Sequence, residues 1–263
     1  MMEKIYQVDA FTDKPFSGNP AGVCILFKPQ SESWMQAVAA EMNLSETAFL
    51  YKQGDIFNLR WFTPTVEVEL CGHATLASAH ILWESGFLSP QQIAKFQTRS
   101  GLLTAERKGQ YIELNFPAMP AEPSDIPPGL SLALGVAPDY SGKNKFDYLL
   151  ELQSEDIVRS MQPDFAKLEK LPVRGIIVTA QATSPEYDFV SRFFAPGAGI
   201  NEDPVTGSAH CCLGPYWSKK LSKNEFTAYQ ASKRGGVIRV RVQGKRVYLS
   251  GKAVTVFKGE IVV

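Results

Sequence analysis

Residues 73–82 read HATLASAHIL, a run in which small or apolar side chains would occupy nearly every face of a helix. A helix of this composition has no polar face to present to water, so we expect protein to surround it. Gly86 favours an end to this helix, predicted over Ala74–Ser85, because glycine adopts the left-handed conformation of a helix cap. Short strand-like runs, rich in β-branched and aromatic residues, lie on both sides. The sequence therefore predicts a sheet that wraps around one buried helix.

The same pattern recurs in the second half of the chain. The pentapeptide RWFTP at 60–64 is matched by RFFAP at 192–196, and each precedes a glycine that opens a small-residue helix. Those glycines are Gly72 and Gly207, and the loop before the second is slightly longer. Two similar hairpins then follow the glycines in constant register. Any two hairpins share some features, but three matches in one order indicate an internal duplication.

We therefore expect an α+β fold of two pseudo-symmetric domains, each a rolled, mostly antiparallel sheet around a central helix. The second central helix is predicted at Ser208–Leu221. The proline-rich segment Pro117–Pro128 reads as a linker. The predicted domains are 1–117 and 118–263, with a terminal strand that can cross back to the first half. A cleft between such halves is the natural ligand site.

The overall composition favours a small-molecule partner. Lys and Arg number 27 and so do Asp and Glu, so no general field attracts nucleic acid or a membrane surface. No window reaches the roughly 18 apolar residues of a membrane span, and the first residues lack the long apolar stretch of a signal peptide, so we expect neither. Four cysteines without CxxC spacing fit a reducing, cytoplasmic location. His73, His80 and His210 lack the spacing of a short ligand pair, so no metal is expected.

The two helix starts suit an anionic ligand. The N–H groups of a first helical turn have no partner within the helix, and the dipole adds positive charge there. Gly72 and Gly207 allow close approach of a ligand to this backbone, and His73 and Ser208 follow them as side-chain donors. For Ser208 ordinary helix capping is an equally good interpretation.

Two carboxyl groups are candidates for proton transfer. The offset between the two pentapeptides pairs Glu46 with Val178, so Glu46 has no symmetric twin and could act as a single acid or base. Its Asn43-x-x-Glu46 context also fits a capping box, which would make the role structural. Asp203 precedes the second helix, where it could accept a proton, orient His73 or form a turn.

Four strings carry a family resemblance: DAFTDKPFSGNPAGVC, NLSETAFL, RWFTPTVEVELCGHATLASAHIL and FFAPGAGINEDPVTGSAHCCLGPYW. Together they closely resemble the PhzF-like isomerases of phenazine biosynthesis, a family related in fold to diaminopimelate epimerase. The resemblance implies two domains that each roll a sheet around a helix, a homodimer, and no metal, flavin or pyridoxal phosphate. It further implies that a proton is relocated near the carboxylate of a small substrate.

The resemblance also assigns roles to residues of this chain. Glu46 matches the general acid/base, and the other matching positions either line the site or bind substrate. The candidate catalytic residues are Glu46, His73 and Asp203. The candidate substrate-binding residues are Gly72, Gly207, Ser208 and Asn19. For Asn19, which precedes Pro20, a turn is the alternative role.

Three other functions fit the residues less well. Related epimerases place a cysteine before each helix-opening glycine; this chain has Cys71 in one place but Thr206 in the other. Because a threonine hydroxyl is too weak an acid, two-base racemisation is disfavoured, although Cys71 with another partner stays an alternative. A hydrolase built on Ser208 and His210 lacks a GxSxG elbow. The third alternative is a protein that binds a small acid but does not catalyse a reaction.

Overall fold

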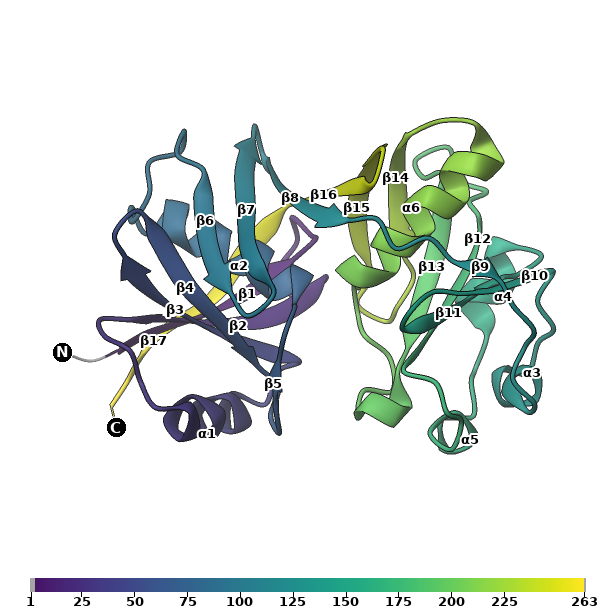
Figure 1. The fold of residues 1–263 in the computed structure, drawn as a ribbon, viewed down its shortest axis with the longest axis horizontal. Helices are drawn as coiled ribbons and strands as arrows, with labels where there is room; N and C mark the ends of the chain where they lie inside the picture. Colours follow the sequence, from purple (N-terminus) through teal and green to yellow (C-terminus); the bar gives the residue numbers. More distant parts are fainter. Residues whose placement is uncertain (1–2, 263) are drawn as a thin grey trace. The chain divides into compact units, whose positions relative to one another are not determined.

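The computed structural model describes residues 3–262 and divides into two compact units. The first unit contains the chain up to Asn115 together with the segment from Ser250 onward, and the second is Phe116–Leu249. The chain enters the second unit within β8 (Tyr111–Pro117) and returns within β16 (Arg246–Gly251), as Figure 1 shows. Each unit therefore has its own strands and its own core.

The first unit is a curled, mostly antiparallel sheet. Neighbouring strands pair antiparallel except at β2–β3 and β4–β6, which are parallel. In sheet order the strands are β17 (Ala253–Ile261), β1 (Glu3–Ala10), β2 (Asn19–Leu26), β3 (Glu46–Gln53), β4 (Ile56–Phe62), β6 (Ala94–Thr98), β7 (Gly101–Lys108) and β8, with the short β5 (Glu67–Val68) beside β4.

Helix α2 (Gly72–Glu84) is the core of this sheet. It contacts β1, β2, β3, β7 and β17, and every residue from His73 to Ala79 is buried. The expected helix surrounded by protein is thus confirmed, and its bounds differ from the prediction by only one or two residues. A second helix, α1 (Glu32–Met42), packs Met35 and Ala39 against Cys24 and Phe49 in a smaller core.

The second unit repeats this plan around α6 (Gly207–Leu221). Its strand pairs are antiparallel except β11–β12 and β13–β14, the counterparts of the parallel pairs in the first unit. In sheet order the strands are β9 (Glu122–Pro123), β10 (Tyr140–Lys143), β11 (Asp147–Glu151), β12 (Gly175–Gln181), β13 (Phe189–Phe194), β14 (Glu225–Gln230), β15 (Gly236–Gln243) and β16.

Aromatic stacking fixes α6 against its sheet. The Trp217 ring stacks on Phe189 of β13 with centroids 5.4 Å apart, and its indole N–H donates to Thr179 Oγ1 of β12 at 3.1 Å. Gly214 leaves room for β15, because a Cβ there would meet Val240 at 3.0 Å and Val242 at 3.1 Å. Close packing on two sides confirms the prediction of a second helix wrapped by a sheet.

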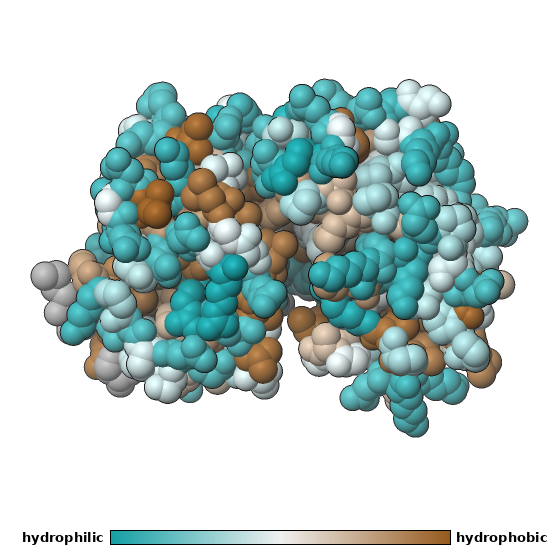
Figure 2. Space-filling model, viewed as in Figure 1, coloured by the Kyte–Doolittle hydropathy of each residue, from teal (hydrophilic) through white to brown (hydrophobic). Residues whose placement is uncertain are grey.

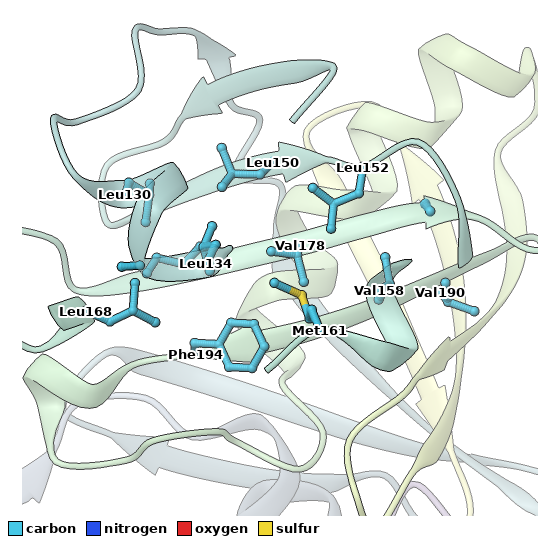
Figure 3. Close-up of a cluster of buried hydrophobic side chains, with 13 residues drawn as sticks. Leu130, Leu134, Leu150, Leu152, Val158, Met161, Leu168, Val178, Val190 and Phe194 are labelled. Carbon is cyan, nitrogen blue, oxygen red and sulfur yellow. The ribbon is translucent and has the colours of Figure 1, made fainter. Parts of the chain in front are cut away.

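Three short helices form a further core in the second unit. They are α3 (Leu130–Leu134), α4 (Glu155–Ser160) and α5 (Phe165–Leu168). Figure 3 shows Leu130, Leu134, Val158 and Leu168 around Val178 and Phe194 of the sheet. The segment from Pro117 also belongs here: Met119 N donates to Cys211 O at 3.0 Å, and β9 pairs with β10.

The duplication extends to an ion pair in each unit. Arg60 Nε donates to Glu67 Oε1 at 2.7 Å, and Arg192 Nε donates to Glu202 Oε1 at the same distance. Both guanidinium groups make a second bond to the same carboxylate, so each pair is bidentate. The arginines open the two matching pentapeptides, and the glutamates keep the same spacing as the two helix-opening glycines. The repeat seen in the sequence therefore holds at the level of side-chain contacts.

One sequence alignment is corrected by strand register. Phe49 lies opposite Arg60 in β3–β4, and Val178 lies opposite Arg192 in β12–β13. Val178 is therefore the counterpart of Phe49, and Glu46 corresponds to Gly175. The prediction failed because the connection between β12 and β13 is longer than that between β3 and β4. Glu46 still has no carboxyl twin.

The visible surface is mainly hydrophilic. On the face drawn in Figure 2, hydrophobic residues are interspersed among hydrophilic ones, as expected for a chain with 27 cationic and 27 anionic side chains. Among the residues the structure describes, no helix has both the length and the hydropathy required to cross a bilayer.

Candidate active site

The start of α2 lacks a side-chain cap. Cys71 is its N-cap, in an extended conformation with φ −142° and ψ 114°, and its side chain makes no capping hydrogen bond. The Cys71 carbonyl instead accepts from Thr75 Oγ1 at 2.5 Å. No capping side chain therefore competes with a ligand for the first-turn N–H groups.

Glu46 begins strand β3. The capping-box interpretation is wrong, because Asn43 is the C-cap of α1 in the left-handed conformation and no helix starts at this point. Strand β3 lies parallel to β2, where Glu46 is level with Ala21. In a parallel pair, neighbouring residues face the same side of the sheet, and Asn19 lies two residues before Ala21 on that side. Register thus brings the Glu46 carboxylate toward α2.

The Glu46 and His73 side chains meet inside the unit. Glu46 Oε2 lies 3.1 Å from His73 Nε2, and the two side chains are only 13% and 5% exposed. The separation is that of an ion pair, but the direction is unsuitable for a hydrogen bond. Neither atom has a hydrogen-bond partner among the described residues. Two buried polar atoms with unused bonding capacity are unusual in a folded protein and are characteristic of sites that bind or react.

The other ring nitrogen of His73 has two neighbours. The Asn19 amide nitrogen lies 3.2 Å from His73 Nδ1, and Cys71 Sγ lies 3.6 Å from it. Asn19, which the sequence alone would equally allow as a turn residue, is fully buried as the first residue of β2. The first unit thus gathers Asn19, Glu46, Cys71 and His73 into one cluster.

Burial decides the charge of Cys71. It raises the pKa of the thiol to about 11, with the negative charge of Glu46 as the next cause. Burial also opposes a charge on His73, but neighbouring negative charge favours the protonated ring, and the pKa of His73 is raised. Because Cys71 remains a thiol at neutral pH, Glu46 is the anion that acts on the ring.

The matching helix start in the second unit has a different polar network. Thr206 is the N-cap of α6, extended like Cys71 and likewise without a capping hydrogen bond. Its hydroxyl donates to Asp203 Oδ2 at 2.5 Å. The fully buried Gln230 accepts from Thr206 N at 2.8 Å and donates to the Asp203 carbonyl at 2.7 Å. A network therefore holds Asp203 and the N-cap together.

The predicted site residues are thus divided between the units. Glu46, His73, Gly72 and Asn19 lie in the first, and Asp203, Gly207 and Ser208 in the second. Sequence reasoning missed Gln230, which comes from the end of β14 and carries no motif. Its importance arises only because β14 pairs in parallel with β13 and ends close to the start of α6.

His80 and His210 have structural partners. His80 Nε2 lies 3.1 Å from Thr255 Oγ1, and His210 Nδ1 bonds to the Thr206 carbonyl at 2.8 Å. His210 is fully buried, which lowers its pKa to about 4. A ring engaged with the N-cap carbonyl is not available to activate Ser208, so the hydrolase alternative has no support here.

A family model described as phenazine biosynthesis-like protein matches residues 8–259. The chain belongs to this family. An uncharacterized isomerase from Halalkalibacterium halodurans is 56% identical over the whole of both chains. The crystal structure of a PhzF-family phenazine biosynthesis protein from Enterococcus faecalis covers both chains completely, with 43% identity and a TM-score of 0.96. The predicted family is therefore confirmed.

More distant structures share the fold alone. A probable proline racemase from Agrobacterium radiobacter has a TM-score of 0.68 at 12% identity, over 99% of this chain and 93% of its own. The prediction of an epimerase-like α+β fold, with a rolled sheet around a central helix in each half, is confirmed by the two rolled sheets and agrees with this likeness. The prediction of an isomerase is confirmed by the close relatives that carry that name.

Proposed function

We propose that this chain is a cofactor-independent isomerase that moves a proton within a small carboxylate-bearing metabolite, with Glu46 as the general acid/base. One observation carries the proposal. Glu46 places an unbonded carboxylate oxygen 3.1 Å from a buried histidine, beside a helix start whose N-cap side chain makes no capping bond. An anion-holding backbone next to a proton acceptor is what such a reaction requires.

In the proposed reaction, the first-turn N–H groups from Gly72 onward hold the substrate carboxylate. Glu46 takes a proton from the activated carbon, and the electron pair left on that carbon is delocalised into the adjacent unsaturated or carboxylate group. The same carboxyl then returns the proton to a different carbon of the substrate. His73 orients Glu46 and donates a hydrogen bond where negative charge develops.

Asp203, Gly207 and Ser208 are proposed as substrate residues of the second unit. The Thr206 hydroxyl and Gln230 support Asp203, and α6 offers Gly207 and Ser208 in its first turn. We also propose a cytoplasmic homodimer, which light scattering of the purified chain would test. We also keep the proposed division of the chain into domains 1–117 and 118–263, with a terminal strand that crosses back to the first.

Cys71 defines the second candidate. Its sulfur lies 3.6 Å from a histidine nitrogen, so a thiol-dependent racemase or epimerase has a base within reach. Against it, burial raises the pKa of Cys71 to about 11 and the partner position is Thr206. Cys71→Ser separates the two candidates, since a folded variant that binds substrate but exchanges no substrate hydrogen would favour the thiol, and exchange at the wild-type rate would exclude it.

The test of Glu46 is exchange of substrate hydrogen with deuterated solvent. A panel of small unsaturated carboxylates is first screened by thermal shift, and each binder is then followed by mass spectrometry in D₂O. Glu46→Gln should lose exchange by roughly 100-fold or more, the lower range of general acid–base contributions. Glu41→Gln, an exposed glutamate on α1, is the charge-matched control. If folded Glu46→Gln exchanges substrate hydrogen at the wild-type rate, the role of Glu46 is refuted. If the wild-type protein binds a carboxylate but exchanges no hydrogen, it is a non-catalytic binding protein.

A further inference from the structure

The cluster in the first unit offers three different metal-binding donors. Glu46, Cys71 and His73 can each supply one ligand atom, and these atoms all lie within 4.8 Å of one another. The three histidines of the chain do not form a ligand set by their spacing, whereas this mixed set is drawn from β3 and from the start of α2. Carboxylate oxygen, thiolate sulfur and imidazole nitrogen are together the ordinary ligands of Zn²⁺.

The distances suit a small tetrahedral ion. Ligands placed about 2.0–2.1 Å from Zn²⁺ at a tetrahedral angle are about 3.3 Å apart. Glu46 Oε2 and His73 Nε2 are separated by 3.1 Å, and the three ligand atoms, one from each residue, all lie within 4.8 Å of one another. Because the Cys71 sulfur contacts Nδ1 and not Nε2, its side chain would have to turn toward Nε2 to complete the ligand set.

Two buried polar atoms without hydrogen-bond partners in the described part of the chain point independently to a ligand. Glu46 Oε2 and His73 Nε2 are buried atoms without hydrogen-bond partners among residues 3–262, and the His73 side chain is only 5% exposed. If Nε2 binds a metal, Nδ1 carries the ring proton and needs an acceptor. The Asn19 amide, 3.2 Å away, can turn its oxygen to that position and orient the ring.

We propose that Glu46, Cys71 and His73 bind Zn²⁺ and that the bound ion inhibits the enzyme. As the ion binds, the Cys71 thiol and the His73 ring, which the neighbouring Glu46 charge favours in its protonated form, each lose a proton to solvent, and no electron is transferred. The Glu46 lone pair that would accept the substrate proton is then occupied by the ion. The inhibition rests on the proposed function, whereas the binding of the ion does not.

Cobalt is the probe for binding, because Co²⁺ takes the same sites as Zn²⁺ and gives an intense ultraviolet absorption band when a thiolate coordinates it. Co²⁺ added to the full-length wild-type chain should produce this band, and Zn²⁺ should abolish it by displacement. Cys71→Ser should lose the band and weaken Zn²⁺ binding by more than the roughly 10- to 100-fold that loss of an outer-shell partner costs. Cys24→Ser, a buried thiol of β2 outside the cluster, is the matched control and should keep the band.

Three outcomes would overturn the proposal. Wild-type protein without a thiolate band, a band that survives in Cys71→Ser, or Zn²⁺ that saturates the protein without slowing solvent-hydrogen exchange would each do so. If Cys71→Ser does not fold, Glu46→Gln serves instead, since it should keep the thiolate band but bind Zn²⁺ more weakly. Mg²⁺, which prefers oxygen ligands, should neither displace Co²⁺ nor inhibit. A Co²⁺ band in a protein that exchanges no substrate hydrogen would refute the isomerase and leave the metal site standing.

Discussion

Replacing His210 should remove an acid-sensitive part of the stability of the second unit. The imidazole is fully buried at the start of α6, with Nδ1 bonded to the Thr206 carbonyl at 2.8 Å and the ring stacked on Phe189. Burial without a neighbouring anion disfavours the charged form and lowers the pKa of His210 from 6.5 to about 4. Folding therefore holds this ring neutral at pH values where the unfolded chain would protonate it.

The size of the effect follows from the two pKa values. A group whose pKa is depressed by folding stabilises the folded state above its unfolded pKa, and this stability is lost as the pH falls toward the folded pKa. At about 1.4 kcal/mol per pKa unit, the loss is about 2 kcal/mol between pH 7 and pH 5 and roughly 3 kcal/mol below about pH 4. Most of the loss thus falls between pH 6.5 and about 4.

The assay compares wild type with His210→Gln, which keeps a donor but cannot titrate. Amide hydrogen exchange within α6 gives the free energy of opening for this region, independent of the first unit. Wild type should lose about 2 kcal/mol more than the variant between pH 7 and pH 5. Parallel curves, or an NMR titration of His210 near 6.5, would show that burial does not control this ring.

Two further substitutions test the packing of the second unit, one in its sheet and one at the start of α6. Gly175→Ala should destabilise the second unit by about 1–3 kcal/mol in urea unfolding, because its Cβ would lie 2.3 Å from Phe193 and 2.7 Å from Asp147. Gly197→Ala, where the nearest atom is 3.4 Å away, is the control, and equal losses in both would contradict the packing argument. Gln230→Leu should cost roughly 1–3 kcal/mol by leaving the Thr206 N–H unpaired. Its expected signature is faster amide exchange at the start of α6, and unchanged exchange there would mean that Gln230 does not hold the N-cap.

Much of the fold could be predicted because local patterns and global packing agree. The run HATLASAHIL has no polar face, and the structure buries it inside a sheet, while Gly86 follows α2 with φ +74°. Helix α3 was missed because its five residues between Gly129 and Gly135 are too short to show a period. Its stability comes from contacts with α5 and the sheet, which only the folded chain reveals.

The site was only partly predictable, for a related reason. His73 and Glu46 were found through motifs, but their approach depends on the parallel pairing of β2 with β3, and no sequence periodicity encodes that register. The offset between the halves failed at Glu46 because it changes within the connection that follows β3 and β12. Two-base racemisation is disfavoured by the sequence because Thr206 stands in the place of a second cysteine, but only the fold shows that the Cys71 sulfur lies against His73.

The duplicated framework also explains why chemistry can be concentrated in one half. Both units keep the bidentate Arg–Glu pair, the extended N-cap and the glycine that opens the central helix. At the position of Glu46 the second unit has Gly175, where Phe193 and the Asp147 carboxylate fill the space of a side chain. A glutamate there would clash with Phe193 and bring a second negative charge against Asp147. The second unit is therefore packed against a carboxylate at the position that matches Glu46, so the proposed reaction would return the proton through Glu46 itself or through a different kind of donor.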